Sequence, residues 1–212
     1  MGDARVATAE GLSASLARIL PRGVRSGARA ISADDVATLL EDERSFVQRA
    51  VAARRAEYGT GRVLLRHLAG TSAPIGTRVD RTPAWPEGLV GSLAHDHRFV
   101  VAAVSSLPGI RSIGLDIEPV RVLDRATAAL VVRPDEEVDP LLAFVAKEAA
   151  YKAWHGIGGR MLEHHDVRVV VRGDPRTGAP AAFEASVVGD AHLHGWCVRS
   201  GDRWLASVVV VA

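Results

Sequence analysis

The sequence predicts an α+β fold with two similar halves joined near residue 110. Apolar residues recur at three- and four-residue spacings over 34–69 and again over 139–156, which indicates two helices. Short apolar, β-branched runs bounded by Gly, Pro and Asp follow each helical segment, which indicates antiparallel strands. This order of helix and then strands, met twice along the chain, is typical of the α+β class.

In the N-terminal half, either Ser32 or Asp34 can cap the helix predicted over 34–69, and a glycine follows its last residue. A pair of glycines near 59–61 predicts a break within it. The segment 70–88 is rich in proline and glycine and is expected to be a loop. This half therefore presents one long helix followed by a long loop.

The apolar run 99–105 is followed by a Pro-Gly turn and then by the run 112–118, so we predict that the two runs pair as an antiparallel hairpin. Asp139 is a good N-cap, and Pro140 suits the first position of the helix that continues to 156. Four further strands, separated by hairpin-type turns, are expected over 167–172, 182–188, 196–199 and 204–211.

Two carboxylates alternate with aliphatic residues within the run 112–118. This period of two indicates a half-buried strand, so Asp116 and Glu118 leave the same face. Residues two apart on a strand lie about 6.5 to 7 Å apart. The two carboxylates are therefore close enough to bind one hard cation, and Gly114 leaves room beside them.

A third carboxylate, Glu148, lies on the second helix between Lys147 and Lys152. Cations beside an anion suit phosphoryl transfer: lysines stabilise charge on the leaving group, and a carboxylate accepts the proton of the attacking hydroxyl. Mg²⁺ is the expected ion, with Mn²⁺ as an alternative, since both accept oxygen ligands. Taken alone, an Asp-x-Glu pair is more often an exposed feature of a strand. Glu148 and Lys152 alone would more often form an i,i+4 ion pair on a helix surface.

Net charge, cysteine count and apolar run length argue against several classes of protein. The chain has 212 residues and a net charge of +1, from 26 Lys+Arg and 25 Asp+Glu, which gives no support for generic nucleic-acid binding or a polybasic membrane surface. The single cysteine excludes internal disulfides and Cys-rich metal sites. No apolar run is long enough to span a membrane. We expect a soluble, unprocessed protein of the cytoplasm.

Four blocks of the chain stand in a definite order. Residues 114–118 read G-x-D-x-E, and residues 144–152 read F-x-x-K-E-A-x-x-K. Upstream, residues 85–95 read W-P-x-G-x-x-G-S-x-x-H, and residues 54–62 begin with Arg54-Arg55 and end with Arg62. In this order the blocks resemble the 4′-phosphopantetheinyl transferase superfamily in its surfactin- and enterobactin-type branch, where the last block matches an arginine-bearing helix. The coincidence of four ordered blocks is far more specific than any one of them.

The resemblance implies an enzyme that transfers the 4′-phosphopantetheine group of coenzyme A to a serine of an apo acyl, peptidyl or aryl carrier protein, releasing adenosine 3′,5′-bisphosphate. The acceptor would serve fatty acid, polyketide, nonribosomal peptide or siderophore synthesis. It also implies a monomer in which each half is a long helix packed on a small antiparallel sheet. Coenzyme A would lie in the cleft between an N-terminal half, 1–110, and a C-terminal half, 111–212, that carries the metal-binding strand.

The resemblance also implies a role for each matching residue. Asp116, Glu118 and Glu148 would bind Mg²⁺, and Asp116 would also bind the pyrophosphate of coenzyme A. Glu148 would be the general base, and Lys147 and Lys152 would hold phosphate oxygens and stabilise the departing nucleotide. Ala94 stands where the family usually has Ser or Thr, so only its backbone would contact the nucleotide of coenzyme A. The remaining coenzyme A ligands would be Arg54, Arg62, His95, Lys147, and either Arg78 or Arg81, between which the sequence does not choose.

Two other functions stay open. A metal-dependent phosphohydrolase would use Asp116, Glu118, His95 and His97 around one or two ions, with water as the acceptor. A non-catalytic protein of the same fold would bind coenzyme A or a carrier protein without turnover. The run 164–166, His-His-Asp, is expected to be a loop before a strand, with no role in the chemistry.

Overall fold

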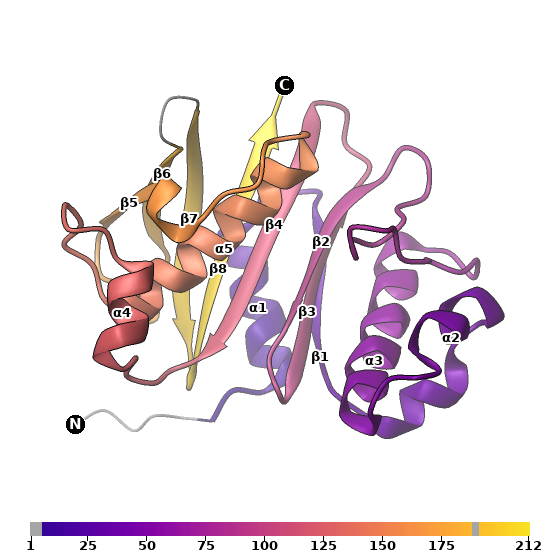
Figure 1. Cartoon of the computed structure of the whole chain (residues 1–212). Coiled ribbons are helices and arrows are strands. Elements are labelled where there is room, and N and C mark those ends of the chain that lie inside the picture. The colour runs from indigo at the N-terminus through magenta and orange to yellow at the C-terminus, as the bar shows by residue number, and fades with distance from the viewer. Residues whose placement is uncertain (1–5, 188–190) are drawn as a thin grey trace.

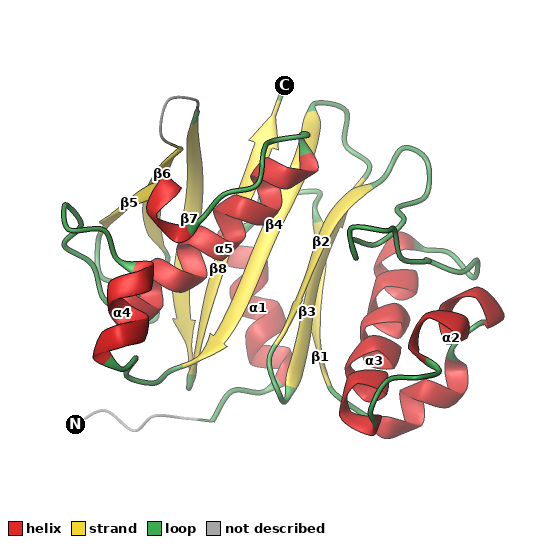
Figure 2. Ribbon diagram, viewed as in Figure 1, coloured by secondary structure: helices red, strands yellow, loops and turns green. Residues whose placement is uncertain are grey.

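Two antiparallel sheets organise the chain, and the fold is α+β as the sequence predicts (Figures 1 and 2). The computed structural model describes residues 6–187 and 191–212. The first sheet has the order β1-β3-β2, and the second has the order β4-β8-β7-β6-β5. The strands are β1 Arg25–Ala30, β2 Val90–His95, β3 Phe99–Ser105, β4 Ile110–Pro119, β5 Val167–Arg172, β6 Ala181–Val187, β7 His192–Ser200 and β8 Arg203–Val211.

Helices cover both sheets. The α-helices are α1 Ala9–Ile19, α2 Glu41–Val47, α3 Ala52–Ala69, α4 Arg125–Val131 and α5 Pro140–Gly156, and the short 3-10 helices are η1 Ala33–Thr38, η2 His164–Asp166 and η3 Pro175–Thr177. Helix α3 packs on the first sheet, while α5 packs on one face of the second sheet and α1 on its other face (Figure 1). No helix in the described part of the chain is both long and apolar enough to cross a membrane.

The second predicted helix is confirmed. The Asp139 carboxylate accepts hydrogen bonds from the amides of Leu141 and Leu142 at 3.0 and 3.1 Å, and Pro140 is the first residue of α5. The four C-terminal strands are also found, although β7 begins earlier than expected, at His192. Position 188, the expected end of one strand, lies outside the described residues.

The first predicted helix is only partly correct, because η1, α2 and α3 divide it. The predicted break at 59–61 is wrong, since both glycines lie inside α3. A Cβ on Gly59 would lie 3.0 Å from backbone atoms of η1, and one on Gly61 would lie 3.3 Å from Leu93. These glycines allow close packing against neighbours. The end of the helix at Gly70, whose φ is +67°, is as expected.

The predicted hairpin between 99–105 and 112–118 is wrong. Strand β3 is central in its sheet, because β1 and β2 pair with its two edges, so β4 pairs with β8 instead. The edge strands β2 and β4 lie side by side, and the Leu115 amide donates a hydrogen bond to Ser92 Oγ at 2.9 Å (Figure 1). The two sheets therefore meet at this seam.

A shared core joins the two parts of the chain. Leu16 of α1, Val101 of β3 and Leu205 of β8 belong to one buried cluster. The Ser207 hydroxyl donates to the carbonyl of Ile19 at 2.6 Å, so the first helix is anchored on the second sheet. The division into halves 1–110 and 111–212 stays a prediction.

Strand β4 is buried on both faces, whereas the sequence predicted a half-buried strand. Ile113, Leu115 and Ile117 face the core shared with α1, and the other face lies against α5. At Gly114 the two backbones are so close that an added Cβ would overlap the carbonyl oxygen of Ala149. The space that the sequence analysis expected beside the carboxylates at Gly114 is therefore occupied by the backbone of α5.

Gly114→Ala should destabilise the chain, because α5 would have to move away from β4. Overpacking of this kind costs about 1 to 3 kcal/mol, which corresponds to a fall in Tm of about 2 to 12 °C at this chain length. Thermal unfolding followed by circular dichroism measures it. Gly27→Ala in β1 is the matched control, because its Cβ would meet Leu64 at an ordinary 3.5 Å. Equal Tm values for the two variants would contradict this account of the packing.

Candidate active site

Strand β4 presents Asp116 and Glu118 at the seam. Because α5 covers this face, Asp116 is only 6% exposed, and Glu118 is half-buried. Lys152 of α5 donates from Nζ to Asp116 Oδ1 at 2.6 Å and to the Leu115 carbonyl at 3.0 Å. The other oxygen of Asp116, Oδ2, is buried and has no hydrogen-bond partner among the described residues. One carboxylate oxygen at the seam is therefore uncommitted.

Both carboxylates are electrostatically unsatisfied. Burial raises the pKa of Asp116 to about 6, even though the Lys152 ammonium opposes the shift. Burial first, and then the charge of Asp116, raise the pKa of Glu118 to about 7. Raised carboxyl pKa values indicate too little positive charge for two anions in a poorly solvated place. A divalent cation that prefers oxygen ligands would supply this charge.

Glu148, the third carboxylate expected at the metal, pairs elsewhere. Its Oε1 lies 3.4 Å from Nε2 of His164, and this contact lowers the pKa of Glu148, with a further contribution from Lys152. Within the described ranges, no three side chains of His, Cys, Asp or Glu surround one metal position. Mg²⁺ commonly takes only one or two protein carboxylates and completes its shell with water and phosphate oxygens. Asp116 and Glu118 fit such a site.

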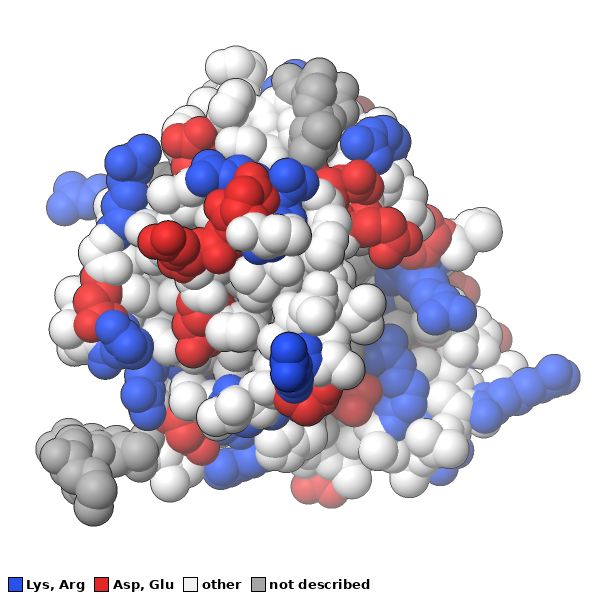
Figure 3. All heavy atoms as spheres, turned by 60° about the vertical axis from the view of Figure 1, so that its left-hand side comes forward, with Lys and Arg blue, Asp and Glu red and all other residues white. Residues whose placement is uncertain are grey.

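A cavity of about 280 Å³ opens between α3 and α5 and reaches Lys152. Arg54 Nη1 lies 2.9 Å from Nε2 of His95 and 3.1 Å from Oε2 of Glu57, so these side chains form one polar wall. On the face of the molecule that carries α4 and α5, by contrast, positive and negative side chains are interspersed (Figure 3). The expected coenzyme A ligands that line the cavity are Arg54, Arg62, Arg81, His95 and Lys152.

Arg62 has a structural part in this wall. It is 2% exposed, and Nη2 donates to the Gly76 carbonyl at 3.1 Å and to Thr77 Oγ1 at 2.6 Å. Its guanidinium carbon lies 4.2 Å from the centroid of the Tyr58 ring. These contacts fix the 70–88 loop against α3. Nε is also buried and has no hydrogen-bond partner in the described part of the chain.

The structure separates Arg78 from Arg81, because only Arg81 lines the cavity. Ala94 is 4% exposed and its methyl group packs in the core. Successive residues of β2 point to opposite faces, so His95 faces the cavity while Ala94 faces away from it. Only the backbone of Ala94 is left for a ligand contact.

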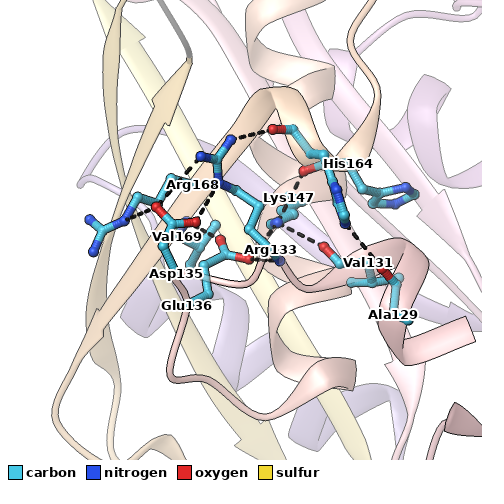
Figure 4. A network of polar contacts seen from close by, with 10 residues as sticks. Ala129, Val131, Arg133, Asp135, Glu136, Lys147, His164, Arg168 and Val169 are labelled. Carbon is cyan, nitrogen blue, oxygen red and sulfur yellow. Dashed lines mark hydrogen bonds and ion pairs between the residues drawn. The ribbon is translucent and has the colours of Figure 1, made fainter.

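The structure does not bring Lys147 to the cavity. Its side chain is 2% exposed, and Nζ donates to the carbonyls of Val131 and His164 at 2.8 and 3.0 Å and to the Glu136 carboxylate at 2.8 Å (Figure 4). These three acceptors use all the protons of the ammonium group. Lys147 therefore connects α5 to the segments on either side of it.

The sequence predicted no role for two aromatic residues of the cavity. The rings of Phe46 and Tyr58 stack with centroids 5.5 Å apart, and both line the cavity. Across the cavity, His155 of α5 lies 3.9 Å from the carboxylate of Asp80. The helical spacing could have indicated Tyr58, since it follows Arg54 and precedes Arg62 by one turn each. Phe46 comes from another helix and gives no such signal.

Comparisons of the sequence with known proteins show a family. A family model described as the 4′-phosphopantetheinyl transferase N-terminal domain matches residues 42–105. The 4′-phosphopantetheinyl transferase Svp of Streptomyces mobaraensis is 32% identical over 202 residues, which cover 84% of this chain and 81% of Svp. PptT of Mycobacterium tuberculosis is 33% identical over 168 residues, 72% of this chain and 74% of PptT. Enterobactin synthase component D of Salmonella typhi is 34% identical over 117 residues, 48% of each chain.

Glu118→Gln should stabilise the metal-free chain in a pH-dependent way. The folded pKa of about 7 lies above the ordinary value, so the charged form is penalised in the folded state. This penalty is absent below a pKa of about 4.3, grows as the pH rises and is complete above pH 7. Because Glu118 is only half-buried, we expect a gain in Tm of about 1 to 4 °C at pH 8 and a smaller gain at pH 5.

Thermal unfolding with a chelator at the two pH values measures the gain. Glu137→Gln, an exposed carboxylate before α5, is the control and should shift Tm at neither pH. A gain for Glu118→Gln that is the same at pH 5 and pH 8 would contradict the raised pKa.

Proposed function

The chain belongs to the 4′-phosphopantetheinyl transferase family, and we propose that it transfers the 4′-phosphopantetheine group of coenzyme A to a serine of an apo carrier protein. The observation that carries this is the position of Lys152. Lys152 contacts Asp116 of the carboxylate pair, and it also lines the cavity between α3 and α5. A ligand in this cavity would thus have its phosphates beside the two carboxylates.

Coenzyme A suits the two ends of this site. Its nucleotide phosphates would lie against Arg54, His95 and Arg81, and the exposed ring of Phe46, which stacks on the buried Tyr58, would offer a flat face to the adenine. Its pyrophosphate would reach Lys152 at the seam. Arg62 would contribute its positive charge, while its Nη2 holds the loop.

We propose Mg²⁺, with Mn²⁺ as an alternative, held by Asp116 and Glu118. The uncommitted Oδ2 of Asp116 and the raised pKa of both carboxyl groups support this. When bound, the ion neutralises the charge of the pyrophosphate. Glu148 would bind the ion as a third carboxylate only if its side chain turned away from His164.

Glu148 is the proposed general base. It is partly exposed, and its lowered pKa keeps it ionised. It takes the proton of the serine hydroxyl, and the serine oxygen forms a bond to the pyrophosphate phosphorus nearer the pantetheine arm. The bond from this phosphorus to the bridging oxygen breaks, and adenosine 3′,5′-bisphosphate leaves with the negative charge. Lys152 stabilises that charge, and Glu148 later releases its proton to water.

The acceptor class is proposed on the same basis. We infer an acyl, peptidyl or aryl carrier protein, and hence a holo-[acyl-carrier-protein] synthase type of reaction, in fatty acid, polyketide, nonribosomal peptide or siderophore synthesis. A monomer suffices, because both walls of the cavity come from one chain.

The transfer is tested by intact-protein mass spectrometry of a panel of apo carrier proteins with this chain, coenzyme A and Mg²⁺. A gain of one phosphopantetheine group on the acceptor serine, lost when a chelator removes the metal, is expected. Coenzyme A binding without a mass gain on any carrier would instead favour a non-catalytic binding protein. Release of phosphate by water alone would favour the phosphohydrolase.

Glu148→Gln should separate chemistry from binding. Removal of a general base lowers kcat by about 10²- to 10⁴-fold, while the affinity for coenzyme A stays near that of the parent. Asp116→Ala should weaken metal-dependent binding of coenzyme A as well as kcat. Single-turnover transfer and isothermal titration measure the two effects, and the exposed Glu137→Gln is the control. A parent-like kcat for Glu148→Gln would exclude it as the base.

A further inference from the structure

His164 lies against the proposed base, although the sequence suggested no role for it. It is the first residue of η2, and its Nε2 is 3.4 Å from Oε1 of Glu148. Nε2 is buried, and it has no other hydrogen-bond partner in the described part of the chain. The distance is slightly long for a hydrogen bond, as is common for catalytic groups before substrate binds. A small rotation of either side chain makes the bond.

His164 is held both at its ring and at its backbone. One face stacks on Phe144, with ring centroids 5.4 Å apart and an interplanar angle of 25°. The His164 carbonyl accepts a hydrogen bond from Lys147 Nζ at 3.0 Å. Phe144 and Lys147 both belong to α5, the helix that carries Glu148. One helix therefore fixes the histidine and presents the carboxylate to it.

The Lys147 ammonium is itself part of a rigid network (Figure 4). Glu136, its carboxylate partner, also accepts from the backbone amides of Arg133 at 2.7 Å and of Val169 at 2.5 Å. These contacts connect α5 with the end of α4 and with β5. A buried and fully paired network of this kind resists displacement, so the position of His164 is well defined.

We propose that His164 is a positioning residue for Glu148 in phosphopantetheine transfer, a role that rests on the proposed function. By holding Oε1, it leaves Oε2 to accept the serine proton. The competing partner is Lys152, one helical turn along α5, which interacts favourably with Glu148 and donates to Asp116. Without His164, the carboxylate would turn toward this ammonium and away from the serine.

Three variants test the role. His164→Phe keeps the stack on Phe144 but removes both nitrogens, His164→Gln restores an N–H donor, and His165→Phe changes the exposed neighbour and is the control. A base displaced by about 1 Å costs up to about 100-fold, so we expect His164→Phe to lower kcat by about 10- to 100-fold with an unchanged KM for coenzyme A. His164→Gln should recover most of this loss, and His165→Phe should behave as the parent.

A double-mutant cycle excludes a merely structural effect. If His164 acts through Glu148, then His164→Phe causes no further loss of kcat in a Glu148→Gln background. A parent-like kcat for His164→Phe, a glutamine variant as slow as the phenylalanine variant, or additive losses in the cycle would each overturn the proposal. A parent chain that transfers nothing to any carrier would instead refute the proposed function.

A measurement that needs no turnover completes the test. The buried Nε2–H proton of His164 should give a slowly exchanging signal in a ¹⁵N-edited NMR spectrum of the parent, and Glu148→Ala should abolish it. A signal that persists in Glu148→Ala, or that is absent from the parent, overturns the contact. This reading holds whether or not the chain has transferase activity, and also if His164→Phe does not fold.

Discussion

The close packing of α5 on β4 is the constraint on which the site depends. Gly114 lets the helix backbone reach the strand, and the small side chains of Ala149 and Ala153 keep it there. This contact covers the face of β4 that carries Asp116, and it places Lys152 within 2.6 Å of that carboxylate. A larger residue at position 114 would separate Glu148 and Lys152 from the carboxylates of β4.

The same packing explains the electrostatics. Asp116 would have an ordinary pKa on an exposed strand, but beneath α5 it loses water and gains only one ammonium. Lys147 and Lys152 lie five positions apart on one helix and therefore point in different directions. Lys147 enters a buried network, while Lys152 faces the seam and the cavity. Two lysines of one motif thus have different environments, one structural and one open to a ligand.

The sequence correctly predicted features of the fold that depend on residues close to one another along the chain. The N-cap of α5 and the strand that carries Asp116 and Glu118 depend on neighbours along the chain, and both are found, although this strand is buried on both faces. The pairing of β3 with β1 depends on residues far apart in sequence, so the expected hairpin was wrong. A glycine within a helical pattern predicts a break, but Gly59 lies inside α3 because it packs against the backbone of η1. No local pattern reveals this contact. His164 was missed for the same reason: its partners lie on α5.

The site divides opposite charges between two parts of the chain. The arginines of the cavity come from α3 and the 70–88 loop, and the carboxylates come from β4, so neither set neutralises the other directly. Direct pairing would give a more stable empty protein, but it would leave no charge for a ligand. Lys152 is the exception, since it contacts Asp116 and also lines the cavity. A polyanion bound with a cation would complete both sets at once, and its binding would then stabilise the folded chain by an amount that rises with the logarithm of ligand concentration. Charges that the protein itself does not pair would therefore supply the affinity for such a ligand, and the close contact between α5 and β4 holds Lys152 and Asp116 in place for it.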